Sequence, residues 1–82
     1  MDREDLLTLR KNLGATQSEM AAAMGVPLRT YQDIEAGISN LRPIHERAAA
    51  WAAVNLALAN DKPEAIPPAV AELLQRAARK LK

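Results

Sequence analysis

Apolar side chains recur every three or four residues along most of this chain, the spacing that places them on one face of an α-helix. The first such stripe lies within residues 2–13, where Leu6, Leu9 and Leu13 share a face. Asp2 precedes the stripe as a helix-capping residue, and a glycine follows it. Since no stretch of the sequence alternates apolar and polar residues over a strand length, the pattern predicts an all-α fold.

Two shorter helices are expected next, separated by one glycine. Thr16 and Glu19 have the spacing of a capping box, in which the threonine hydroxyl and the glutamate carboxylate accept each other's backbone N–H groups. Gly25 ends this second helix, and a third helix is expected from about Pro27 to Ala36. Two short helices joined by a glycine turn form a helix-turn-helix, predicted here at residues 16–37.

The third helix is predicted to have a buried and an exposed face. Tyr31 and Ile34 fall on the inward side, and the small side chain of Ala21 lets the second and third helices approach closely. Polar side chains occupy the outward positions of its N-terminal half: Arg29, Thr30, Gln32 and Asp33. A polar N-terminal half is what a helix needs in order to enter the major groove of DNA.

Two longer helices are expected in the rest of the chain. Asn40 is the expected cap of a fourth helix that covers about 41–60, with Pro43 in its first turn. Eleven of the twelve residues from 48 to 59 are apolar, so this helix must be covered on all sides, and Trp51 is expected to pack. After a polar loop, a fifth helix at about 67–81 carries the stripe Val70, Leu73, Leu74, Ala77 and Leu81.

The length of 82 residues fits one domain, 1–82, which is marginal in size for folding alone. The helices at 41–60 and 67–81 leave apolar surface uncovered, and so they are expected to support a homodimer. Residues 1–61 carry six basic and eight acidic side chains, whereas residues 62–82 carry five basic and two acidic ones. This distribution disfavours strong nonspecific DNA binding by the first part of the chain. The basic end of the fifth helix either complements the helix dipole or contacts nucleic acid.

Composition excludes several classes of site. The chain has no cysteine and a single histidine, His45, which is expected at the surface, so neither a disulfide nor a metal site is predicted. No catalytic triad or glycine-rich phosphate loop occurs, and the chain is therefore expected to be no enzyme and to need no cofactor. No signal peptide and no membrane-spanning run is evident, which leads us to expect a cytoplasmic protein.

Two segments resemble DNA-binding domains of the phage repressor (Cro/C1, or XRE) type. Residues 9–26 read LRKNLGATQSEMAAAMGV, and residues 29–37 read RTYQDIEAG, which is similar to the recognition helix of that family and its closing glutamate-x-glycine. The resemblance covers roughly residues 4–58 and is strongest through residue 37. It implies a five-helix, lambda-repressor-like helix-turn-helix domain that binds double-stranded DNA.

The resemblance also implies roles for individual residues. Base contacts fall on Leu28, Arg29, Gln32 and Asp33. DNA-backbone contacts fall on Thr16, Gln17, Thr30, Ser39, Asn40 and Arg42. Arg10 and Glu35 match a partly buried ion pair between the first and third helices. Pro27 replaces the usual serine or threonine cap, and Tyr31 replaces a smaller aliphatic residue, so the tyrosine hydroxyl is expected to reach solvent, a phosphate or a partner.

Side-chain chemistry agrees with these roles. Arg29 can make a bidentate contact to guanine and Gln32 to adenine, while Asp33 can accept from cytosine or instead hold Arg29 in place. We therefore expect a sequence-specific transcriptional regulator, a repressor that binds a palindromic operator as a homodimer. Two alternatives remain open: an antitoxin-type autorepressor that also binds a toxin protein, and an interaction module that kept the fold without DNA binding.

Overall fold

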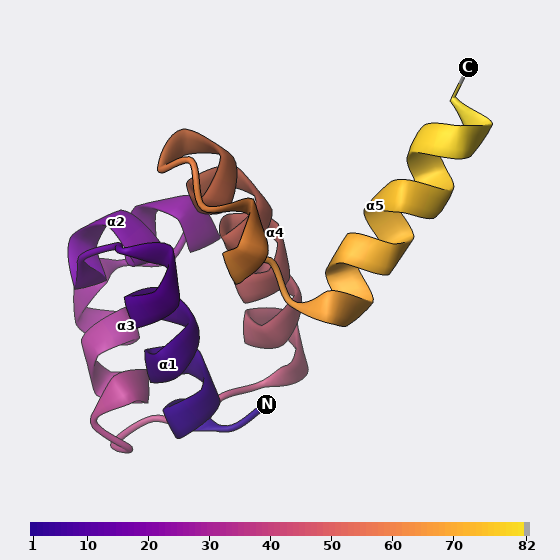
Figure 1. The fold of residues 1–82 in the computed structure, drawn as a ribbon. Coiled ribbons are helices and arrows are strands. Elements are labelled where there is room, and N and C mark those ends of the chain that lie inside the picture. The colour runs from indigo at the N-terminus through magenta and orange to yellow at the C-terminus, as the bar shows by residue number, and fades with distance from the viewer. Residues whose placement is uncertain (82) are drawn as a thin grey trace.

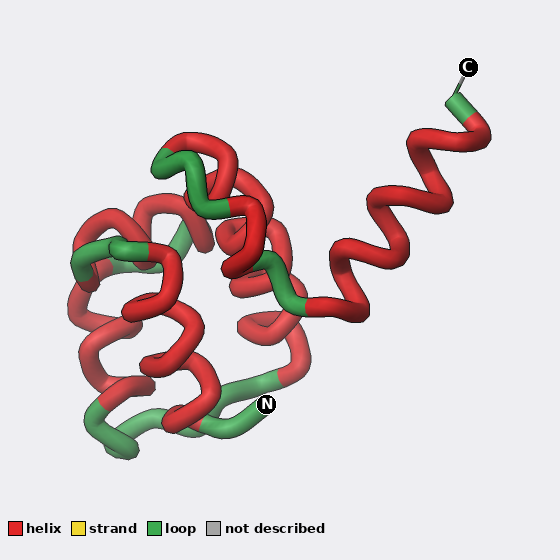
Figure 2. Tube along the Cα trace, in the orientation of Figure 1, coloured by secondary structure: helices red, strands yellow, loops and turns green. Residues whose placement is uncertain are grey.

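The computed structural model describes residues 1–81, which form five α-helices and one short 3-10 helix with no strand in that range. Figures 1 and 2 show a helical body from which the last helix projects. The α-helices are α1 (Arg3–Leu13), α2 (Gln17–Met24), α3 (Leu28–Glu35), α4 (Pro43–Ala59) and α5 (Pro68–Lys80), and the 3-10 helix is η1 (Pro63–Ala65). The all-α prediction is thus confirmed, with helix ends within a residue or two of those expected.

The first two helices begin and end as their capping residues require. The Asp2 carboxylate accepts from the N–H of Asp5 at 2.9 Å, and the Thr16 hydroxyl accepts from the N–H of Glu19 at 3.1 Å. Gly14 and Gly25 follow α1 and α2 with φ angles of 69° and 75°, in the left-handed region. Because side chains with a Cβ disfavour this region, these two positions favour glycine and turn the chain sharply into the next helix.

The start of α4 differs from the prediction. Arg42, rather than Asn40, is the residue that precedes the helix, and its backbone is extended (φ −97°, ψ 161°). The reason is Pro43, since the residue before a proline is driven out of the helical region and therefore cannot lie inside the helix. The His45 ring caps this end by accepting the Arg42 N–H at its Nδ1 atom, 3.0 Å away. The predicted surface histidine is therefore a half-buried capping residue.

The core lies where α1, α2, α3 and α4 meet. Leucine, methionine, tyrosine and isoleucine side chains fill it from the first three helices: Leu6, Leu9, Leu13, Met20, Met24, Tyr31 and Ile34. α4 contributes only alanines, namely Ala49, Ala52, Ala53 and Ala57, and each of these has no exposed surface. Because alanine side chains are small, α4 can lie close against α2, its main neighbour.

The opposite face of α4 carries large apolar side chains that this structure does not cover. Ile44, Trp51 and Leu58 follow one another at seven-residue spacing and are each 68% exposed. Trp51 does not pack within a single copy of the chain, and the expectation that another surface covers this side of the helix stays a prediction. Its ring lies on the far side of the helix from the alanine face, which leaves no room for a large side chain.

The segment between α4 and α5 is more ordered than the predicted polar loop. It contains η1, and the Asn60 side chain donates to the carbonyl oxygen of Leu13 at 2.8 Å, which ties the end of α4 to the end of α1. α5 then extends away from the body, as Figure 1 shows, and none of its residues is buried. The predicted apolar stripe of this helix therefore remains uncovered.

Candidate nucleic-acid interface

The exposed face of α3 carries the side chains that were expected to read bases. Arg29 is the most open of them, with 86% of its side chain exposed, and its Nε lies 3.4 Å from Oδ1 of Asp33. Gln32 and Leu28 are also exposed on this helix. Asp33 thus holds Arg29 in place, which is one of the two roles that its chemistry allows. This ion pair uses one of the five N–H groups of the guanidinium and leaves the other four for further contacts.

The buried face of α3 ends in a cluster of polar side chains around Glu35. Arg10 approaches this carboxylate with two nitrogens, Nε at 2.7 Å and Nη2 at 3.2 Å. The Gln17 amide donates to it at 2.9 Å, and the Tyr31 hydroxyl donates to it as well. The expectation that the Tyr31 hydroxyl reaches solvent, a phosphate or a partner is therefore wrong. Because Glu35 lies one helical turn further along α3, it offers the hydroxyl an acceptor within the chain.

These contacts set the protonation of the cluster. Burial by itself raises the pKa of Glu35, but the hydrogen bonds from Arg10, Tyr31 and Gln17 outweigh burial and hold this pKa below its ordinary value. Burial, followed by the hydrogen bond to Glu35, raises the pKa of the Tyr31 hydroxyl. The hydrogen bond to Glu35 also raises the pKa of Arg10. The cluster is therefore a carboxylate with three neighbouring donors, of which one is cationic.

The cluster reaches the exposed face of α3 through one further contact. The Gln17 side-chain oxygen accepts from the Gln32 amide at 3.4 Å, while the Gln17 nitrogen is bound to Glu35. A continuous chain of hydrogen bonds thus runs from Arg10 on α1, through Glu35 and Gln17, to Gln32. This arrangement positions an exposed amide by means of a partly buried ion pair.

The residues expected to touch the DNA backbone lie on α3, at the start of α2 and in the connector that follows α3. Thr16 is exposed at the start of α2, where its oxygen accepts the Glu19 N–H and its own proton is available to another acceptor. Thr30 is half-buried on α3. The three connector residues Ser39, Asn40 and Arg42 are exposed between α3 and α4. The structure therefore places Gln17 with the residues expected to read bases and leaves the connector residues as a separate group.

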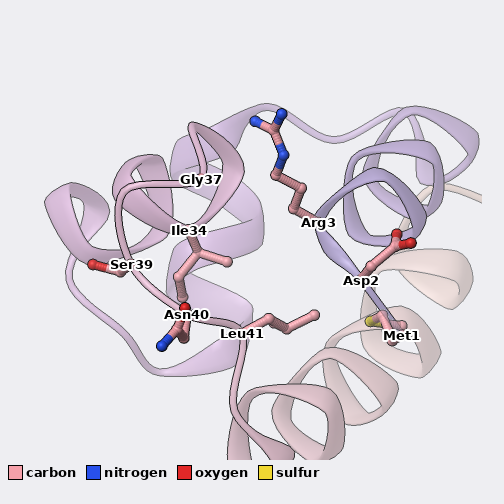
Figure 3. A pocket seen from close by; sticks show the side chains of 8 residues that line it. All are labelled: Met1, Asp2, Arg3, Ile34, Gly37, Ser39, Asn40 and Leu41. Atoms are coloured by element: carbon pink, nitrogen blue, oxygen red, sulfur yellow. The ribbon is translucent and has the colours of Figure 1, made fainter.

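The connector borders a hollow of about 440 Å³ that sequence reasoning missed. Figure 3 shows it between the connector and the N-terminal end of the chain, lined by Arg3, Gly37, Ser39 and Asn40 among others. The Arg3 guanidinium donates to the carbonyl oxygen of Glu35 at 3.2 Å and so caps the end of α3. A Cβ atom at Gly37, where φ is +79°, would lie only 3.1 Å from Arg3 Nη1. Gly37 therefore permits both the turn and this contact.

Comparison with known families agrees with this geometry. Residues 6–45, which include the Glu35 cluster and the exposed face of α3, match the family described as Helix-turn-helix. The match supports a helix-turn-helix of the phage repressor-like (Cro/C1, XRE) type in this segment. It likewise supports a DNA-binding regulator of transcription. No match to the chain was found among curated proteins or among solved structures.

Three residues that fix helix ends were not predicted from the sequence. Arg3, His45 and Asn60 each fix a helix end, and their partners lie on other segments or in atoms of the backbone. Of these, the histidine alone has a local signal, since it stands three residues after the cap position.

Among residues 1–81, no group of three or more histidine, cysteine or acidic side chains is placed to hold a metal ion. Within the same range no helix has the length and apolar character to cross a bilayer.

Proposed function

We propose that this chain is a sequence-specific regulator of transcription, a repressor that binds a palindromic operator in double-stranded DNA as a homodimer. The observation that carries the proposal is the two-sided design of α3. Its inner face is fixed by buried Tyr31 and Ile34 and by the ion pair of Glu35. Its outer face presents Arg29 and Gln32, whose side chains have the donor geometry that guanine and adenine require.

In this proposal α3 enters the major groove with its N-terminal half. Arg29 donates to guanine and Gln32 exchanges two hydrogen bonds with adenine. Asp33 either steers Arg29 or accepts from a cytosine amino group, and Leu28 contacts a thymine methyl group. Pro27 starts the helix without a side-chain hydrogen bond, so no hydroxyl screens the first backbone amides of α3 from a phosphate.

Phosphate contacts would fix the register of the helix on the duplex. Thr16 and Gln17 lie at the N-terminal end of α2, where the helix dipole favours an anion. Thr30 sits beside the base-reading residues, and the connector residues Ser39, Asn40 and Arg42 would reach the far strand. A single domain with so few cations would bind DNA weakly, which is the reason for proposing a pair of domains about 34 Å apart in successive major grooves.

The test is binding of the full chain to a duplex selected from a random library, with Arg29→Ala and Gln32→Ala as the variants. We expect each variant to lose roughly 5- to 150-fold in discrimination at one position of the site, the value of one bidentate base contact. Gln75→Ala, on the polar side of α5, is the matched control and should bind as the wild type does. Equal affinity of all four proteins for the selected site would refute the assignment of base contacts.

The alternatives give different results in the same experiment. Uniform loss of affinity for every sequence would reduce Arg29 and Gln32 to phosphate contacts. Failure to select any duplex would favour the protein-interaction module, which the acidic excess of residues 1–61 also allows. An antitoxin-type autorepressor would select its own upstream region and would additionally bind a second protein.

A further inference from the structure

An apolar groove of about 300 Å³ runs between α4 and α5, away from the face that the proposed function uses. Trp51 and Val54 line it from α4, and Val70, Leu73 and Leu74 line it from α5. Little in it is polar apart from Arg47. Leu73 is 60% exposed, and Leu81, which directly follows α5, is 83% exposed. The groove and the stripe of α5 thus form one continuous apolar surface that the chain leaves open.

We infer that α5 of a second copy of this chain fills the groove. In this dimer, which we call the antiparallel exchange, each α5 stays beside its own α4 and packs against the α5 of the partner copy in antiparallel orientation. The inference rests on the homodimer of the proposed function and names its contact surface. A pair of this kind is isologous, which means that both copies use the same surface. The apolar stripe of each α5 forms one wall of the groove in its own copy and also enters the groove of the partner copy.

The size of the surface supports a second copy as the occupant. The exposed parts of Trp51, Leu73, Leu74 and Leu81 amount to roughly 500 Å² in one copy, on the areas typical of large apolar side chains. Two copies that cover these side chains bury about 1,000 Å², the size at which a specific interface becomes plausible. α5 has 13 residues, and a helix of this length is marginal in water unless another surface covers it.

Charge decides the orientation. The part of the chain up to residue 61 has a net charge of −2, from six basic and eight acidic residues, whereas residues 62–82 have a net charge of +3. The body and the last segment thus carry net charges of opposite sign, whereas the one charged side chain that lines the groove, Arg47, is itself basic. A parallel pair would bring Arg76, Arg79 and Lys80 of both copies together at one end, while an antiparallel pair separates the two basic clusters.

Antiparallel pairing also matches the apolar residues. When the stripe is centred on itself, Val70 of one copy lies opposite Leu81 of the other, and Leu74 lies opposite Ala77. Val70 is a wall of the groove, so the exposed Leu81 enters next to Trp51 and Val54. Ala71 and Ala78 flank the stripe on one side, and their small side chains let two helices approach closely.

The first test follows Trp51, the single tryptophan of the chain, in the absence of DNA. As protein concentration rises, we expect its emission to shift to shorter wavelength in parallel with dimer formation in sedimentation. Leu73→Glu should raise the dimer dissociation constant at least about tenfold, because it places a carboxylate in the covered stripe. Since Leu73 is exposed in one copy, the folding of each copy should be unchanged by far-UV circular dichroism. Gln75→Glu, which adds the same charge on the polar side of α5, is the matched control.

The second test fixes the orientation with single-cysteine variants, since the natural chain has none. Val70→Cys and Leu81→Cys are oxidised separately and then as a mixture. Antiparallel pairing predicts disulfides between the two variants only. Parallel pairing predicts disulfides within each variant, because residues 70 and 81 are about 16 Å apart along a helix, too far for a cross-link between unlike positions.

The outcomes separate this inference from the proposed function. A monomer at all concentrations, an unchanged Trp51 emission in the dimer, or cross-links between like variants would overturn the antiparallel exchange. So would an emission shift that appears only when a different protein is added. A monomer at all concentrations would also remove the homodimer of the proposed function, whereas the other results would leave that homodimer intact. None of these results would affect the base contacts of Arg29 and Gln32. Conversely, loss of those contacts with an intact exchange would overturn the proposed function alone.

Discussion

Removal of the Glu35 carboxylate tests whether the cluster beneath α3 stabilises the domain. Its side chain is 7% exposed and that of Arg10 is 16% exposed, so the pair is largely shielded from water. Glu35→Ala leaves the Arg10 guanidinium, the Tyr31 hydroxyl and the Gln17 amide without their shared acceptor. Breaking a fully buried pair costs about 3–5 kcal/mol. Because Arg10 retains some contact with water, we expect a loss of about 2–3 kcal/mol in the free energy of unfolding.

The measurement is urea unfolding followed by far-UV circular dichroism. In a domain of this size the expected loss corresponds to a fall of roughly 10–20 °C in the melting temperature. Glu4→Ala is the matched control, since Glu4 is an exposed acid in the first turn of α1 and should cost less than about 1 kcal/mol. A loss below about 1 kcal/mol for Glu35→Ala would refute the reasoning, because an isolated surface pair is worth no more.

A double-mutant cycle and a pH series locate the effect in the carboxylate. With Arg10→Met and Glu35→Leu, the double variant should lose less stability than the two single variants together. The lowered pKa of Glu35 means that its contribution is present above its ordinary value of 4.5 and disappears as pH falls through the lower native pKa. The difference in stability between wild type and Glu35→Gln should therefore shrink on acidification below 4.5. A difference that is constant with pH would contradict this assignment.

The other predictions address single contacts. Burial and the hydrogen bond to Glu35 raise the pKa of Tyr31, the single tyrosine, so native protein should show no phenolate absorbance at its ordinary pKa of 10.0, and stability should fall as pH rises above that value. Gly25→Ala should cost about 1–2 kcal/mol in urea unfolding, because the new Cβ has space but the backbone is left-handed. Asn60→Ala should cost about 1 kcal/mol in the same assay, since the carbonyl of Leu13 loses its donor. Arg42→Ala should weaken binding to all duplexes alike and lower the salt dependence of the binding constant by about one counterion.

Much of the helix-turn-helix was predictable because its signals are local. A capping box such as Thr16 with Glu19 and a left-handed glycine such as Gly25 act within one turn of chain, so they can be read from neighbouring letters. The pairing of Arg10 with Glu35 spans 25 positions, and it came from a resemblance to a family. Periodicity alone indicates that both residues lie on helices but does not bring them together.

Some features of the fold escaped prediction because they depend on distant parts of the chain. The apolar run of α4 predicted cover on all sides; the four alanines fill the space against α2, while nothing in a single copy covers Trp51. The sequence shows which positions are apolar, and it does not show what covers them. The caps made by Arg3 and Asn60 belong to the same class, because each side chain binds a carbonyl oxygen more than thirty residues away.

The all-alanine face of α4 has a consequence for how the protein can change. An alanine has no side-chain rotamers to lose, so this seam forms without that entropic penalty. It also contains no torsion that can rotate to absorb a larger neighbour, and one added methylene there costs about 1–3 kcal/mol through overpacking. On the outward face of the same helix, a larger side chain meets no neighbour within a single copy and so causes no overpacking there. Mutation can therefore redesign what the outward face of α4 binds while the packing of its alanine face on α2 stays fixed.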